Sequence, residues 1–110
     1  MTTVAIKEKY VEALTALGDL EDAVDRALQR YSIEQITTKV AELQEREKKY
    51  QERYGMSYET FAQRTAEDVA FINQLETQGY KTWEIDLADW EFCHKGIRDW
   101  TQKLESILLR

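Results

Sequence analysis

The chain has 110 residues, 43% of them hydrophobic, which is enough for one folded domain and too few for two independent cores. It has no proline and only four glycines, so a β-sandwich or barrel, which needs turn residues every ~8–12 positions, is nearly excluded. The net charge of −6 argues against general binding to nucleic-acid backbones or anionic membranes. A single cysteine, Cys93, indicates a reducing compartment, and no apolar stretch approaches the ~18 residues of a membrane span. With no signal-peptide core after Met1, we expect a cytoplasmic protein that does not bind membranes.

Residues 1–31 allow two interpretations. Apolar residues at helical spacing predict a first helix over Val4–Leu17, ended by Gly18, and this is the interpretation we favour. The alternation over Thr3–Lys7, followed by helix, glycine and helix, also looks in outline like a ribbon-helix-helix DNA-binding domain, in which strands of two chains pair and enter the major groove. The acids that begin the next helix would repel phosphate. The residues facing DNA in that case would be Thr3, Ala5 and Lys7.

A second helix is predicted over Leu20–Tyr54, capped by Asp19, because no glycine or proline interrupts this stretch. Its apolar stripe changes phase between Tyr31 and Ile33. Ser32, with a glutamine three residues later, resembles a capping box at that point. The pattern is compatible with a break at Ser32 and with a continuous helix that turns its apolar face towards a second partner.

The C-terminal part is predicted to contain two short helices and a long one. We expect Ser57 to cap a helix over Tyr58–Arg64, and Thr65 with Asp68 to mark the start of another over Ala66–Gln78. This second short helix should bury three residues: Val69, Ile72 and Leu75. Thr82 should cap a final helix from Trp83 to about Leu109, which carries all three tryptophans.

The final helix has the strongest apolar periodicity in the chain and should pack antiparallel to Ile33–Tyr54. We expect four of its residues to be buried: Trp90, Ile97, Trp100 and Leu104. Their neighbours on the other long helix should be Ile36, Val40 and Leu43. The predicted fold is thus all-α: a single domain of residues 1–110, in which residues 32–110 form an antiparallel helical bundle of two long helices with short crossing helices, with a short N-terminal β-ribbon as the variant.

The sequence offers no complete catalytic or metal-binding set. Glu91 and His94 have the Glu-x-x-His spacing of carboxylate di-iron bundles, but such a site needs two of these motifs and His94 is the only histidine. Cys93 and His94 point ~100° apart on a helix, and Cys93 lies on the apolar stripe, which favours a buried, inert thiol. We therefore expect no enzyme activity, no cofactor and no metal.

Aromatic residues gather in the C-terminal two thirds, and a chain this small cannot bury all of them. Exposed aromatic residues next to acids on a rigid helix are typical of protein–protein contacts. We expect the partner-binding residues to be Tyr80, Trp83, Glu84, Glu91, Phe92 and Asp99.

One stretch, Tyr50 to Phe61, has the sequence YQERYGMSYETF and resembles the KYGMSYEEF signature of small helical prokaryotic proteins encoded beside a compact ribonuclease-like toxin. The segment WEIDLADWE from Trp83 resembles the helix that follows in those proteins, and ALQRY from Ala27 is similar to a run common in antitoxins. The resemblance implies an antitoxin that neutralises a basic, ribonuclease-like toxin by direct contact, and it implies no catalytic residues.

Two other functions remain open at this stage: a transcriptional repressor that binds operator DNA through a ribbon-helix-helix dimer, and a structural helical dimer or adaptor. We expect a homodimer under each of these functions, because helices this long expose more apolar surface than one small domain can cover.

Overall fold

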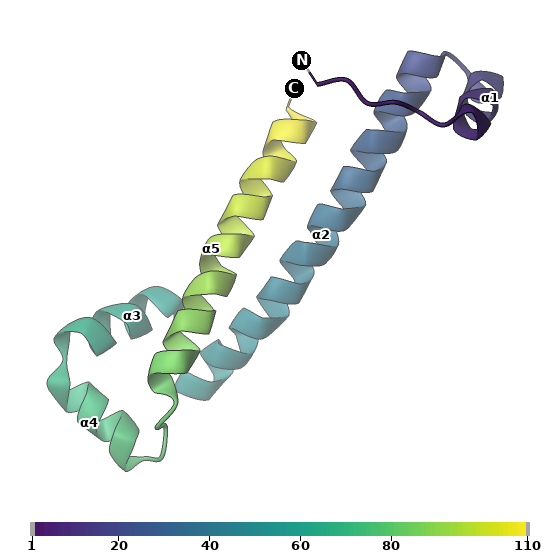
Figure 1. The fold of residues 1–110 in the computed structure, drawn as a ribbon. Coiled ribbons are helices and arrows are strands. Elements are labelled where there is room, and N and C mark those ends of the chain that lie inside the picture. Colours follow the sequence, from purple (N-terminus) through teal and green to yellow (C-terminus); the bar gives the residue numbers. More distant parts are fainter. Residues whose placement is uncertain (1, 110) are drawn as a thin grey trace. The chain divides into compact units, whose positions relative to one another are not determined.

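The computed structural model describes residues 2–109, which form five helices and, within that range, no strand (Figure 1). The helices are α1 (Glu8–Leu17), α2 (Leu20–Tyr54), α3 (Tyr58–Glu67), α4 (Val69–Thr77) and α5 (Trp83–Leu108). The predicted all-α class is therefore confirmed for these residues. The chain divides into two compact units, Met1–Gln35 (unit 1) and Ile36–Arg110 (unit 2), and α2 contributes residues to both.

The first helix begins four residues later than predicted. Lys7 has an extended backbone (φ −64°, ψ 140°) and occupies the N-cap position, and its carbonyl oxygen accepts a hydrogen bond from the Tyr10 amide at 2.9 Å. Val4 and Ile6 are β-branched and favour extended backbone, whereas Glu8 is acidic and favours the first turn of a helix. The segment before Glu8 is thus not helical, and it forms no β-ribbon within residues 2–109.

Helix α2 runs through Ser32 without a break, which decides the question that the sequence left open. Its start is capped as predicted: the Asp22 amide donates a hydrogen bond to Asp19 Oδ2 at 3.2 Å. Because the helix stays continuous, the change of phase near Ser32 turns its apolar stripe to a new direction.

Helices α3 and α4 meet at Asp68. Ser57 caps α3 as predicted, because its Oγ accepts a hydrogen bond from the Thr60 amide at 3.2 Å. The prediction of a second cap at Thr65 is wrong: Thr65 is buried inside α3, and Asp68 caps α4 by accepting from the Phe71 amide at 3.1 Å. Val69 consequently occupies the first position of α4, where it is 70% exposed instead of buried. Leu75 is buried as predicted, and Ile72 is half-buried.

A tight turn after α4 aims α5 back along unit 2. The Tyr80 amide donates to the Leu75 carbonyl at 2.9 Å, and the Gly79 amide donates to the Glu76 carbonyl at 3.2 Å. This pair of bonds is a Schellman cap, which needs a left-handed residue, and Gly79 supplies it with φ 91°.

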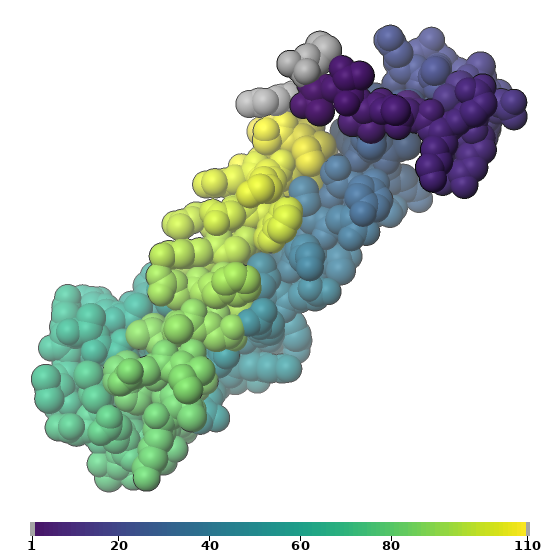
Figure 2. Space-filling model, in the orientation of Figure 1, coloured from purple at the N-terminus to yellow at the C-terminus, as the bar shows by residue number. Residues whose placement is uncertain are grey.

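The core of unit 2 is an aromatic cluster around Trp90 and Phe61, both fully buried. The two rings stack at 5.3 Å between centroids, and Tyr54 stacks on Phe61 at 4.3 Å. The Trp90 indole nitrogen has no hydrogen-bond partner among residues 2–109, and the Trp90 ring packs against the rings of Tyr50 and Tyr58. Figure 2 shows the atoms of α3, α4 and the first turns of α5 massed together in teal and green at one end of unit 2.

The predicted contact between the long helices of unit 2 is correct only in part, because Trp90 packs among Tyr50, Tyr54, Tyr58 and Phe61 and not against the predicted neighbours. Trp90, Ile36 and Leu43 are buried, and Cys93 is buried as expected. The remaining residues of the predicted contact are only half-buried: Val40, Ile97, Trp100 and Leu104. Helix α3 packs only against the N-terminal part of α5. The later turns of α5 are therefore covered by α2 but not by α3.

The long helices approach closely at Gly96, a residue that the sequence analysis did not single out. A Cβ atom at Gly96 would lie 2.9 Å from Leu43 Cδ1, inside van der Waals contact. Gly96 thus removes a side chain where Leu43 needs the space.

We predict that Gly96→Ala and Leu43→Ala are coupled in stability. Alanine gains about 1 kcal/mol of helix propensity over glycine, but with Leu43 present the new methyl group displaces the leucine. Gly96→Ala should therefore be more favourable in a Leu43→Ala background, by about 0.5–1.5 kcal/mol in the free energy of unfolding. Urea unfolding followed by tryptophan fluorescence measures this, because all three tryptophans lie in unit 2.

Ala88→Gly, at an exposed site on the same helix, is the control and should be additive with Leu43→Ala. Additive effects of Gly96→Ala and Leu43→Ala would contradict the close approach.

Candidate functional site: an acidic groove between α3 and α5

A groove of about 390 Å³ lies between α3 and α5 in unit 2, and we call it the acidic groove. Its lining residues are Ala62, Thr65, Ala66, Trp83, Glu84, Leu87, Ala88 and Glu91. Three alanines leave room between the helices, and Trp83 and Leu87 supply larger apolar side chains. The charged residues of the lining are both glutamates.

The aromatic core holds the two walls of this groove in place. Phe61 anchors α3 in the core, one position before Ala62, and the Thr65 hydroxyl donates to the Phe61 carbonyl at 2.9 Å. Trp83 and Leu87 are half-buried and pack against the core cluster. The groove is thus built on two helices rather than on a loop. Ser57 caps α3 as predicted, but the predicted cap of α5 is wrong, because the Thr82 side chain makes no capping hydrogen bond.

The two glutamates of the groove differ in their surroundings. Glu91 Oε1 forms an ion pair with Lys95 Nζ at 2.5 Å, one turn along α5, and this pair raises the pKa of Lys95. Glu84 is exposed and forms no ion pair within residues 2–109. The groove therefore keeps an unneutralised carboxylate beside the Trp83 ring.

The structure places three of the six predicted partner-binding residues in the acidic groove: Trp83, Glu84 and Glu91. Tyr80 is half-buried and packs against the core, its ring 5.4 Å from Tyr54. Phe92 is 61% exposed and lies outside the groove, with the Arg46 guanidinium 5.6 Å from its ring centre. Asp99 is exposed and also lies outside the groove.

The α3 side of the groove was missed by the sequence analysis. Its signal is the pair Ala62 and Ala66, small residues four apart that share one helix face. In the sequence this pair looks like any two alanines on a solvent-exposed helix face, because nothing there shows that α3 turns this face towards α5.

A row of polar contacts fixes the start of α5 on α2. The Tyr50 hydroxyl donates to Asp89 Oδ2 at 2.6 Å, and the Tyr54 hydroxyl donates to Asp86. Arg46 pairs with Asp89, and Arg53 Nε lies 3.3 Å from Asp86 Oδ2. Burial and the hydrogen bond to Asp86 raise the pKa of Tyr54 to about 12, and burial with Asp89 raises the pKa of Tyr50 still further. Residue numbers rise along α2 as they fall along α5, so the two helices are antiparallel here.

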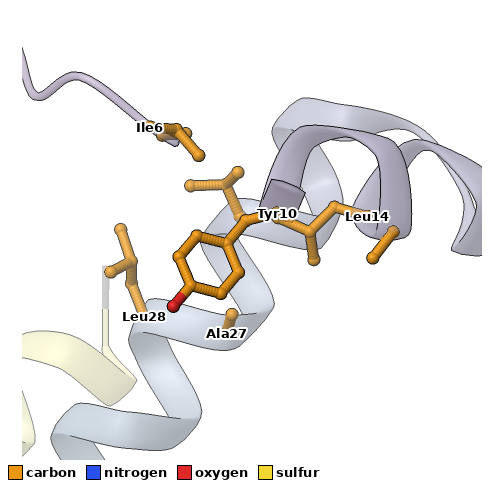
Figure 3. A pocket seen from close by; sticks show the side chains of 7 residues that line it. Ile6, Tyr10, Leu14, Ala27 and Leu28 are labelled. Carbon is orange, nitrogen blue, oxygen red and sulfur yellow. The ribbon is translucent and has the colours of Figure 1, made fainter. Parts of the chain in front are cut away.

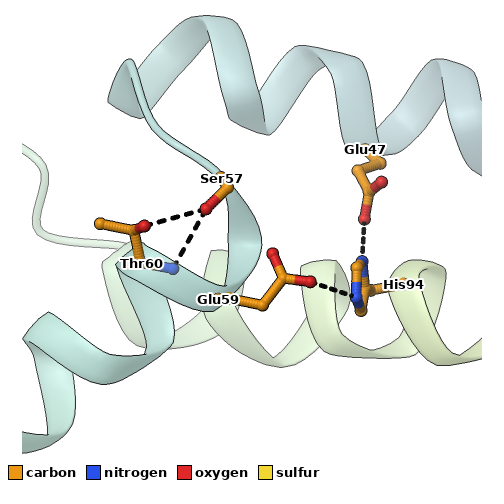
Figure 4. A network of polar contacts seen from close by, with 5 residues as sticks. All are labelled: Glu47, Ser57, Glu59, Thr60 and His94. Atoms are coloured by element: carbon orange, nitrogen blue, oxygen red, sulfur yellow. Dashed lines mark hydrogen bonds and ion pairs between the residues drawn. The ribbon is translucent and has the colours of Figure 1, made fainter.

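His94 joins three helices and does not share a site with Glu91. Its Nδ1 lies 2.8 Å from Glu47 Oε2 on α2, and its Nε2 lies 3.0 Å from Glu59 Oε1 on α3 (Figure 4). The ring also stacks on Tyr58 at 4.6 Å. Within residues 2–109 no group of three or more histidine, cysteine or acidic side chains is arranged to hold a metal ion. Burial raises the pKa of the Cys93 thiol, which keeps it protonated and unreactive.

The candidate DNA-facing residues Thr3, Ala5 and Lys7 are exposed in the segment before α1. They alternate with Val4 and Ile6, and Ile6 contributes to an apolar groove of unit 1.

No helix within residues 2–109 is long and apolar enough to cross a membrane. No protein-family model, curated protein or solved structure matches the chain.

We predict that the stability of unit 2 falls as the pH rises from about 10 to 12. The unfolded chain loses the Tyr54 proton near pH 10, whereas the folded chain holds it to about pH 12, so alkali favours unfolding in this window. Below pH 10 this contribution is fully present. Tyr54→Phe should flatten the decline by up to about 1.4 kcal/mol per pH unit.

The control is Tyr31→Phe, an exposed tyrosine in unit 1, which should leave the profile of unit 2 unchanged. Urea unfolding by tryptophan fluorescence at pH 9 to 11.5 measures both variants. An equal decline in Tyr54→Phe and in the unmodified chain would refute the role given to the Tyr54–Asp86 bond.

Proposed function

We propose that the protein is a non-enzymatic binding protein, an antitoxin that neutralises a basic, ribonuclease-like toxin by holding it at the acidic groove. The observation that carries this proposal is the combination of an apolar wall with charges of one sign: Trp83 and Leu87 beside Glu84 and Glu91. The resemblance of Tyr50–Phe61 to antitoxins supports the same function.

The chemistry of the groove suits a lysine or arginine side chain of the partner. Its aliphatic part would lie along Leu87 and over the alanines, and its charged end would reach Glu84. A cation over the Trp83 ring would gain a further attraction, which is largest where water is excluded. A toxin that grips RNA carries such basic side chains on its active face, so a bound groove would also cover that face.

We predict that two variants separate the charge from the shape of the groove. Glu84→Lys should slow association with the toxin encoded next to this gene and weaken the dependence of that rate on salt, because exposed charges mainly steer encounter. Ala66→Leu fills the groove from an exposed position and should speed dissociation about tenfold or more. Surface plasmon resonance at two salt concentrations measures both rates, and growth rescue on co-expression measures neutralisation.

Glu105→Lys is the matched control, since it makes the same charge change at an exposed site of α5 outside the groove. A partner that binds all three variants with unchanged rates does not use the groove. If the neighbouring product binds but is not toxic, the protein is an adaptor and not an antitoxin.

A second candidate function is that of a DNA-binding repressor, and the lack of helix over residues 2–7 favours it. A continuous helix over Val4–Leu17 would have removed the ribbon, whereas the segment is free of helix up to Lys7. In a paired ribbon Thr3, Ala5 and Lys7 would face the major groove of operator DNA.

We predict under this second function that deleting residues 2–7 abolishes binding to the promoter of the gene while the tryptophan fluorescence of unit 2 stays unchanged. Lys7→Ala should weaken binding to all sequences alike and lower its salt dependence, as expected for a phosphate contact. Electrophoretic mobility shifts measure this. Promoter DNA that the full chain does not retard would exclude the repressor.

A further inference from the structure

Unit 1 lacks a core of its own. Within residues 2–35 no side chain is buried, and α1 has ten residues without a side-chain cap. Isolated helices this short are marginal in water, so packing must supply their stability. A unit whose most buried side chains are only half-buried has little such packing within itself.

Apolar side chains nonetheless line up within unit 1. They form a groove of about 380 Å³ between the segment before α1, α1 itself and α2, and we call it the unit-1 groove. Its lining residues are Ile6, Tyr10, Ala13, Leu14, Val24, Ala27 and Leu28. Figure 3 shows the Tyr10 ring reaching from α1 towards Ala27 and Leu28 of α2, with Ile6 at the open side.

Unit 1 leaves a large amount of apolar surface open. Six large apolar side chains of unit 1 are between 41% and 82% exposed: Val4, Ile6, Tyr10, Leu17, Leu28 and Tyr31. If a large side chain fully exposed presents ~150–250 Å², these six leave roughly 700 Å² open over the whole of unit 1. Three of the six, Ile6, Tyr10 and Leu28, line the unit-1 groove. Standard interfaces bury about 800 Å² on each partner.

Charge indicates the kind of occupant. Glu21 and Asp25 line a second apolar hollow that shares Ile6, Val24 and Leu28 with the unit-1 groove. Basic residues adjoin the same apolar residues in sequence: Lys7, Lys9 and Arg26. A surface of mixed sign can pair with a copy of itself, since away from a two-fold axis an acidic residue of one copy can face a basic residue of the other. The acidic groove of unit 2 has only carboxylates among its charged side chains, so it would repel a copy of itself.

We infer that the unit-1 groove is covered by unit 1 of a second copy of this chain, in a two-fold dimer in which α1 and the first turns of α2 of both copies share one apolar core. A second copy is present wherever the chain is made, and it would complete the burial of side chains that unit 1 alone leaves half-buried or exposed. The dimer rests on unit 1 alone and does not depend on the antitoxin proposal.

The experiment is sedimentation equilibrium of the full chain, with no other protein present. The unmodified chain should be a dimer at micromolar concentration. Leu28→Glu places a charge in the unit-1 groove and should give a monomer with reduced helix content by circular dichroism and unchanged tryptophan fluorescence, because all tryptophans lie in unit 2. Leu28→Ala, which keeps a good helix former, should raise the dimer dissociation constant about tenfold or more.

The matched control is Leu108→Glu, the same change at a leucine of similar exposure on α5, and it should remain a dimer. An unmodified chain that stays monomeric up to about 100 µM overturns the inference, and that result would assign the groove to a different protein. A dimer that survives Leu28→Glu and is broken by Leu108→Glu overturns it as well. Binding of the toxin by a monomeric Leu28→Glu variant would leave the antitoxin proposal intact, so the two ideas fail separately.

Discussion

The burial of Trp90 between three helices is the interaction on which unit 2 depends. Its indole stacks on Phe61 of α3 and on Tyr50 and Tyr54 of α2, and it is completely shielded from water. Aromatic rings supply the largest apolar area per residue, so one such cluster can hold short helices that could not persist alone. Tyrosines at the edge of the cluster leave hydroxyl groups that must be paired. Asp86 lies one turn before Trp90 and Asp89 lies one residue before it, and their carboxylates accept hydrogen bonds from these hydroxyl groups.

This arrangement ties the acidic groove to the core. Trp83 begins α5 one turn before Leu87, and both pack against the cluster that holds Trp90. Any shift of α5 on α2 would have to break the bonds of the tyrosines to Asp86 and Asp89. The groove is therefore held in shape before a partner arrives, which lowers the entropy cost of binding.

Sequence patterns predicted the parts of this fold that depend on local chemistry. The helical class, the caps at Asp19 and Ser57 and the buried Cys93 follow from side chains acting on their own turn of backbone or on an apolar stripe. The predicted start of α1 was wrong. β-Branched residues within Thr3–Lys7 favour extended backbone over helix, and no side-chain cap stabilises a helix start in this segment. The cap at Thr65 was wrong because its hydroxyl satisfies the Phe61 carbonyl inside α3, and periodicity does not distinguish a buried threonine from a capping one.

The candidate site, too, could be predicted from the sequence only in part. Trp83, Glu84 and Glu91 could be identified because aromatic and acidic residues on one helix are visible in the sequence. Ala62, Ala66 and Gly96 matter through the space that they leave, and the value of that space depends on which helix faces them. No local pattern contains that information. Tyr80 and Phe92 have similar chemistry, yet only one packs into the core, because the turn at Gly79 directs Tyr80 inwards.

The two grooves differ in charge, and for this reason we propose different occupants for them: a second copy of the chain for the unit-1 groove and a basic partner for the acidic groove. The acidic groove is built from residues 62–91, all within unit 2, so each chain carries a complete copy of it whether or not unit 1 finds a partner. A dimer through unit 1 would then hold two identical acidic grooves, and toxin binding would keep a ratio of one to one per chain. Dimerisation would raise the apparent affinity only for a partner that is itself multimeric, since only then does the second contact become intramolecular. For a monomeric toxin the dissociation constant should be the same for the proposed dimer and for a monomeric variant, because the residues proposed to contact the toxin would be the same in both.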